Sequence, residues 1–237
     1  MKNTFKKLFI SFTVLSLTAC GSTTMQDNTF AAKENKDFTK YTNQLVVEYA
    51  ENDYTTMHQF FEHPEDYGID INNVDVSLGE FYTDNTEKIK EDQKELNKFN
   101  RSTLDKTQQT IYDELKYENE LSLKAENKKF QYLNNCWSTM SGLHQSLISV
   151  FSEYILRNEK DIQDLITLIN DVPRYTNDVL EYTKKQADKN TLQFDYDSVT
   201  QDIQDVINTK EDSSITSALY NAIDILNLDE EKTTSYK

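Results

Sequence analysis

The sequence predicts an all-α protein, an irregular assembly of about eight or nine helices. Two observations lead to this prediction. Glycine occurs four times and proline twice in 237 residues, which leaves few of the turns that a β-rich fold needs. After residue 37, apolar residues recur three or four positions apart through most of the chain. This spacing places them on one face of a helix.

The first 20 residues are typical of a bacterial lipoprotein signal peptide. Lysines at the start precede an apolar stretch over residues 8–17, and the small residues of "LTAC" end at Cys20. We expect cleavage after residue 19 and lipidation of the Cys20 thiol by acyl chains such as palmitate. The lipid would anchor the protein on the extracytoplasmic face of the cell membrane. The alternative is an ordinary secretory signal in which this cysteine has no role.

Residues 20–37 are expected to be the lipidated cysteine and a flexible tether. The stretch "GSTTMQDNTFAAKENKD" is small and polar and has no periodicity, as in flexible linkers. Apart from the leader, no stretch approaches the roughly 20 apolar residues that span a bilayer.

Residues 38–237 are expected to form one all-α domain, since about 200 residues can bury a core of their own. Helical stripes include Phe38, Tyr41, Leu45 and Tyr49; Ile162, Leu165, Ile166 and Ile169; Tyr175, Val179 and Tyr182; Val199, Ile203 and Val206; and Ile215, Leu219, Ala222, Ile223 and Leu226. Asn158 is a typical helix start, and Asp171 ahead of Pro173 predicts a second one. That second helix is expected to stop at Asn190.

The charge argues against nucleic acid as a partner. Removal of residues 1–19 takes away three lysines and no acid, so the net charge falls from −16 to −19. Such a surface repels phosphates. We interpret the charge as a means of solubility outside the cell rather than as an acidic recognition face. With Cys20 lipidated, Cys136 has no partner for a disulfide or a thiolate zinc site, so we expect it to be buried.

"HQFFEHPEDYGI", residues 58–69, is the first place to look for a metal site. His58 and His63 are five positions apart, about 140° around a helix, and therefore do not share a face. Proline also pushes the residue before it, His63, out of helical geometry. We interpret the stretch as a helix end in which Met57, Phe60 and Phe61 pack.

The remaining candidates for chemistry are isolated. His144 has no neighbouring ligand in sequence, Ser141–Gly142 lacks the pattern of a nucleophile elbow, and the glycines form no phosphate loop. We therefore predict no catalytic, metal-binding or cofactor-binding residue in this chain.

Several segments, taken in order, resemble the bacterial domain-of-unknown-function 885 family. They are "FFEHPEDYGI", "VSLGEF", "LDKTQQTIYDELKYENE", "SEYILRNEKDIQDLITLINDVPRYTNDVLEY" and "LNLDEEKTTSYK". The resemblance covers nearly everything after the tether. It departs from the family at "NNCWSTMSG", where members tend to contain proline.

The resemblance implies a helical, zinc-dependent peptidase-like protein, often lipid-anchored and about twice this length or more. The family's metal motif, His-Glu-x-x-Pro-Gly-His, lies in its C-terminal half. Here the three histidines are followed by Gln59, Pro64 and Gln145, so no catalytic residue carries over. Zinc is implied for a full-length member only. The end "LNLDEEKTTSYK" looks like a helix start with Asp229 as its cap, which suggests a gene fragment, a decayed copy or a separately encoded half.

Two functions remain. The first is an anchored lipoprotein that corresponds to the N-terminal lobe of a peptidase-like protein and is inactive alone; its partners would be a peptide substrate or the missing C-terminal half. The second is a lipid-anchored helical module that binds a peptide or protein. Whether the protein is an enzyme stays open, because the family suggests a hydrolase and the chain carries no catalytic motif.

Overall fold

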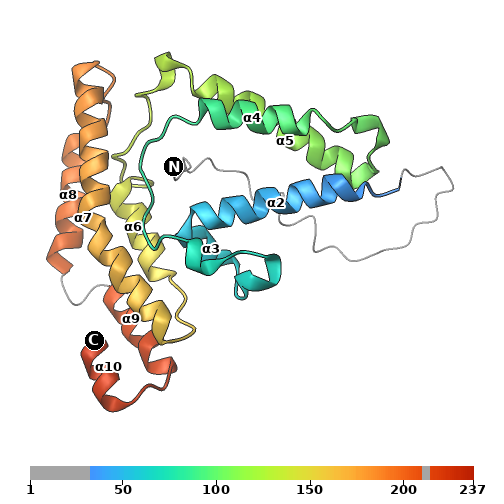
Figure 1. The fold of residues 1–237 in the computed structure, drawn as a ribbon. Helices are drawn as coiled ribbons and strands as arrows, with labels where there is room; N and C mark the ends of the chain where they lie inside the picture. The colour runs from blue at the N-terminus through green and yellow to red at the C-terminus, as the bar shows by residue number, and fades with distance from the viewer. Residues whose placement is uncertain (1–32, 210–213) are drawn as a thin grey trace. The chain divides into compact units, whose positions relative to one another are not determined.

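The computed structural model describes residues 33–209 and 214–237. The expected signal peptide (1–19), Cys20 and most of the tether lie outside the described residues. Within them, every regular element is helical: nine α-helices, four short 3-10 helices and no strand (Figure 1). The all-α prediction is confirmed. No helix among the described residues is long and apolar enough to cross a membrane.

The chain divides into two compact units, a division that the sequence analysis did not anticipate. Among the described residues, unit 1 comprises 33–49 and 83–131, and unit 2 comprises 50–82, 132–209 and 214–237. The chain thus leaves unit 1 near the end of its first described helix and returns to it for one helical hairpin.

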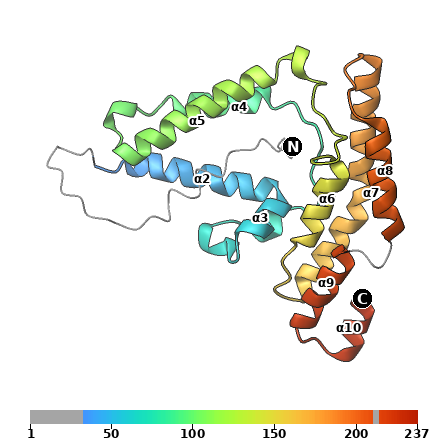
Figure 2. The ribbon, with the colours of Figure 1, turned by 180° about the vertical axis from the view of Figure 1, so that it is seen from behind.

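Unit 1 contains most of α2 (Lys36–Asn52), α4 (Thr86–Leu96), η3 (Arg101–Thr103), α5 (Lys106–Ala125) and η4 (Lys128–Phe130). Helices α4 and α5 pack side by side (Figures 1 and 2). The core contains Phe38, Leu96, Leu104 and Tyr112, with Tyr41, Phe99, Ile111 and Leu115 against it. It is almost wholly apolar and aromatic.

Helix α5 begins at a complete capping box. The side chain of Asp105 accepts a hydrogen bond from the backbone N–H of Gln108 at 2.8 Å, and Gln108 reaches back to the Asp105 backbone. This arrangement satisfies backbone donors that a helix leaves open at its N-terminus. The buried Gln108 amide also bonds the backbone of Asn35, so it ties the start of α5 to the residue before α2.

Unit 2 contains the remaining helices. They are α3 (Tyr54–Phe60), η1 (Pro64–Tyr67), η2 (Ile71–Asn73), α6 (Leu143–Ser152), α7 (Glu159–Asp188), α8 (Tyr196–Thr209), α9 (Ser214–Ile225) and α10 (Glu230–Tyr236). Helices α7 and α8 lie side by side in both views, and α9 contacts α6 and α10 (Figures 1 and 2).

The caps of two helices in unit 2 confirm predictions. Asn158 caps α7 and forms a capping box with Asp161. Asp229 caps α10 by accepting from the backbone of Lys232 at 2.8 Å. The Lys232 ammonium then reaches Glu159 at the start of α7, at 2.7 Å.

The prediction of a second helix start near Asp171 is wrong. Helix α7 runs unbroken for 30 residues with Pro173 inside it. An interior proline costs about 3 kcal/mol or more, but Leu168 and Val179 are fully buried on either side of it, and this burial stabilises both halves of the helix. The Asp171 carboxylate instead accepts from the Leu78 backbone at 2.8 Å and pairs with Arg174 at 2.6 Å. The expected end is correct: Asn190 lies two residues after α7 with a φ of 55°.

Candidate functional site

A group of connected polar side chains in unit 2 surrounds His58. Asp53 caps α3 by accepting from the backbone of Thr56 at 3.1 Å. Tyr54 and His58 then fall one turn apart on the same face of that helix. The His58 ring packs against two tyrosine rings, 5.6 Å from Tyr54 and 4.2 Å from Tyr154, nearly parallel to both. His58 is consequently only 5% exposed.

Hydrogen bonds assign the tautomer of His58. Its Nε2 lies 2.6 Å from the backbone oxygen of Ile155. A carbonyl only accepts, so Nε2 carries the proton and Nδ1 is the acceptor. Arg157 faces this second nitrogen at 3.5 Å, and its guanidinium also donates to the His58 backbone oxygen at 2.7 Å. Both ring nitrogens are therefore directed at protein groups.

Burial lowers the pKa of His58 below its ordinary value of 6.5. Removing the imidazolium from water is the largest effect. The Ile155 carbonyl and the carboxylate of Asp161, 3.9 Å from Nδ1, act in the opposite direction, whereas Arg157 assists the lowering. At neutral pH the ring is uncharged. It joins α3 to the segment that precedes α7.

Two buried tyrosines and two carboxylates complete the group. The Tyr54 hydroxyl donates to Asp164 at 2.8 Å and lies 3.0 Å from the Tyr154 hydroxyl. Burial raises the pKa of both tyrosines, so both are neutral phenols. Asp164 also pairs with Lys160, and Asp161 accepts from the backbone of Arg157 at 2.8 Å.

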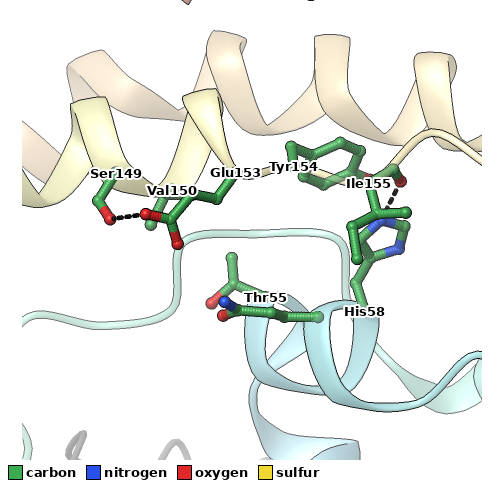
Figure 3. A pocket seen from close by; sticks show the side chains of 8 residues that line it. Thr55, His58, Ser149, Val150, Glu153, Tyr154 and Ile155 are labelled. Carbon is green, nitrogen blue, oxygen red and sulfur yellow. Dashed lines mark hydrogen bonds between the residues drawn. The ribbon is translucent and has the colours of Figure 1, made fainter. Parts of the chain in front are cut away.

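A small pocket of about 80 Å³ opens beside this group (Figure 3). One wall comes from α3 and the other from the end of α6 and the loop after it. The pocket is lined by Thr55, His58, Gln59, Ser149, Val150, Glu153, Tyr154 and Ile155. Both polar and apolar side chains line it.

The other two histidines lie apart from this site. His63 has left the helix, with φ −127° and ψ 75° immediately before Pro64, as predicted. Its side chain is 65% exposed and lies 3.6 Å from Glu65. His144, on α6, contacts Asp202 of α8 through Nε2 at 2.5 Å. That contact and a bond from Gln145 lower the pKa of Asp202.

The structure confirms the helix end at "HQFFEH" and corrects one detail. Helix α3 ends at Phe60, and Met57 and Phe61 are buried as expected. Phe60 differs from the expectation, because it is 42% exposed and is not part of the buried core with Met57 and Phe61. Among residues 33–209 and 214–237, no three His, Cys, Asp or Glu side chains gather closely enough to hold a metal ion.

Cys136 is buried, as predicted, at 6% exposed. Burial raises the pKa of its thiol to about 11, so at neutral pH the thiol is protonated and a poor nucleophile. It packs with Leu143, Val179 and Tyr182 in the apolar core of unit 2.

The sequence analysis missed Tyr54, Tyr154 and Glu153. The spacing of Tyr54 and His58 is visible in the sequence and could have indicated a shared face. No sequence signal pairs them with residues 153–164, which lie about 100 positions further along.

The comparison with protein families agrees with the resemblance found in the sequence. The family described as "Bacterial protein of unknown function (DUF885)" matches residues 72–236, which include α4 to α10 and the segments from "VSLGEF" onward. The match begins after "FFEHPEDYGI". No curated protein and no solved structure is significantly similar to the chain. On the strength of the family match, which covers more than half of its residues, the chain belongs to the DUF885 family.

Proposed function

We propose that this protein is a lipoprotein held at the extracytoplasmic face of the membrane through Cys20. Its helical body would correspond to the N-terminal lobe of a zinc-dependent peptidase-like protein and would be inactive alone. Family membership over residues 72–236 supports the lobe, and the leader ending in "LTAC" supports the anchor. The peptidase-like activity is what the family resemblance implies.

The proposal that the chain is inactive alone rests on its three histidines, each of which contacts a different group of the protein. A catalytic zinc needs about three converging protein ligands and one open position. His58 directs Nε2 at the Ile155 carbonyl, His63 is exposed and lies near Glu65, and His144 pairs with Asp202. Bringing them to one ion would require unit 2 to unfold locally.

Metal analysis of the protein tests this assignment. After dialysis against zinc-free buffer, the full chain should retain far less than one equivalent of zinc and should cleave no peptide in a mixed substrate library. The paired variants His58→Leu and His63→Leu report on the two histidines of "HQFFEH". If the wild type retains one equivalent and either variant loses it, the inactive assignment is wrong.

The anchor is tested at Cys20. In cells fed a palmitate analogue that can be tagged, the wild-type protein should carry the label and sediment with membranes. Cys20→Ala should abolish the label and leave an unprocessed or released protein, whereas Cys136→Ala, the matched control, should keep it. Unchanged fractionation of Cys20→Ala together with an unchanged mass of the mature N-terminus would exclude lipidation at this position.

A second function, a membrane-anchored binding module, is favoured by the pocket beside His58 (Figure 3). The two functions differ in their partner. A lobe should associate with a second polypeptide that carries His-Glu-x-x-Pro-Gly-His, and co-expression with such a segment should give a stable complex with peptidase activity. A binding module should bind its ligand without that segment.

A further inference from the structure

The pocket beside His58 is lined by both polar and apolar side chains. Thr55 and Gln59 of α3 and Glu153 after α6 supply oxygen atoms, whereas Val150 and Ile155 supply methyl groups. In Figure 3 the Glu153 carboxylate points toward the space between the two walls. A ligand that fits has to be short and amphipathic.

The charge of the lining is −1 at neutral pH. Glu153 is the only acid among the lining residues, and the only lining residue that could become a cation is His58. Burial lowers the pKa of His58 and raises that of Tyr154, so both rings are neutral. The pocket therefore favours a cation over an anion.

The carboxylate of Glu153 keeps accepting capacity. Ser149 donates to its Oε1 at 3.1 Å, and an ionised carboxylate has about four lone-pair sites. Thr55 donates its hydroxyl to Asp53 at 2.7 Å, which leaves its oxygen able to accept. The carboxamide of Gln59 makes no hydrogen bond to any other residue that the structure describes.

We propose that this pocket binds a short primary alkylammonium group. The three N–H donors of an ammonium match the three acceptors from Glu153, Gln59 and Thr55, and the methylene chain lies against Val150 and Ile155. A volume of about 80 Å³ is roughly half of a cavity that holds benzene, so a chain of three or four carbons fits. The group can belong to a small free amine or to a lysine side chain of a peptide.

The expected affinity is low. Glu153 is exposed to solvent, and an exposed ion pair contributes little to affinity. Burial of three or four methylene groups adds only a modest amount. After the cost of association, dissociation constants in the millimolar range follow. This proposal rests on neither the lipid anchor nor the peptidase-like assignment.

Methyl NMR of the full chain tests the site, because the methyl groups of Val150 and Ile155 line it. Titration with n-butylammonium should shift these signals in a saturable manner, whereas 1-butanol and butanoate should bind more weakly or not at all. No saturable shift with n-butylammonium, or an equal response to butanol or butanoate, would overturn the proposal.

Variants separate charge from shape. Glu153→Gln keeps the size of the side chain and should weaken n-butylammonium binding about fivefold, equivalent to about 1 kcal/mol. Glu120→Gln makes the same change on exposed α5 in unit 1 and should leave binding unchanged. Gln59→Leu removes an acceptor from an exposed position without touching the end of α6, and it should also weaken binding. Wild-type affinity in both Glu153→Gln and Gln59→Leu would place the ligand elsewhere.

A second pair of probes identifies the source of the amine. Nα-acetyl-lysine amide should bind if the pocket receives lysine side chains of peptides, with Nα-acetyl-norleucine amide as the uncharged control. Binding of n-butylammonium without acetyl-lysine amide assigns the site to small free amines. Equal binding of the norleucine compound would show that the ammonium contributes nothing and would contradict the proposal.

Discussion

The core of unit 1 and the group around His58 in unit 2 are both buried, but they are built from different chemistry. Phe38, Leu96 and Leu104 are fully buried in unit 1, and edge-to-face contact between Phe38 and Phe99, at 5.1 Å, adds to the packing. In unit 2, His58, Asp161 and Asp164 are less than 10% exposed and depend on hydrogen bonds.

The difference determines how each region responds to pH and to substitution. An apolar core gains stability in proportion to the area that it removes from water, and no protonation step changes that area. A buried polar group is stable only while its partners and its protonation state are kept. Truncating a side chain in the apolar region should therefore cause the larger loss of stability. Substitutions in the polar region should make stability depend more steeply on pH.

The largest effect is expected from Phe38→Ala. Removal of a fully buried phenylalanine leaves a cavity and should lower the free energy of unfolding by about 3–5 kcal/mol. Urea denaturation checks this value, and the loss should be the same at neutral and mildly acidic pH. Phe130→Ala in the same unit, where the ring is 48% exposed, is the matched control. A loss for Phe38→Ala no greater than that of Phe130→Ala would contradict the core assignment.

An intermediate effect is expected from His58→Leu. The substitution removes the imidazole that the Ile155 carbonyl and Arg157 contact. The loss should lower the free energy of unfolding by about 1–3 kcal/mol at neutral pH. Since the pKa of His58 in the folded state is lowered below 6.5, the unfolded state binds more protons as the pH falls below that value. Wild-type stability therefore decreases as the pH falls from 6.5 toward the folded pKa.

The variant lacks this contribution of His58. The stability difference between wild type and His58→Leu should consequently be largest above pH 6.5 and shrink in more acidic solution. His63→Leu, which changes an exposed histidine, should change stability by less than about 0.5 kcal/mol. A constant difference between wild type and His58→Leu across this pH range would show that His58 is not held neutral by burial.

The smallest effect is expected from Asp105→Ala. Loss of the cap of α5 should cost about 1 kcal/mol, well below the cost of Phe38→Ala in the same unit. Asp105→Asn should retain most of the stability, because asparagine caps helices about as well as aspartate. Thermal denaturation distinguishes the two variants. Equal losses would indicate that the charge of Asp105, rather than its hydrogen bond to Gln108, stabilises α5.

Local features were predictable because they depend on neighbours in sequence. The caps at Asn158 and Asp229 follow from side chains that accept from backbone N–H groups two or three residues on. The departure of His63 from helical geometry follows from its contact with the proline after it. The predicted helix break before Pro173 was wrong. The unfavourable effect of proline acts only on its own turn of the helix, and the burial of α7 before and after Pro173 outweighs it.

The sequence by itself determined that the protein is all-α, which family it resembles, and that His58 and His63 do not share one face of a helix. These conclusions depend on periodicity, on capping and on the geometry of one turn. Only the tertiary structure decided what surrounds His58 and where the pocket lies, because Tyr154, Ile155 and Asp164 contact α3 across about 100 residues. Such contacts follow from the packing of whole helices, and the packing depends on the burial of all their faces at once.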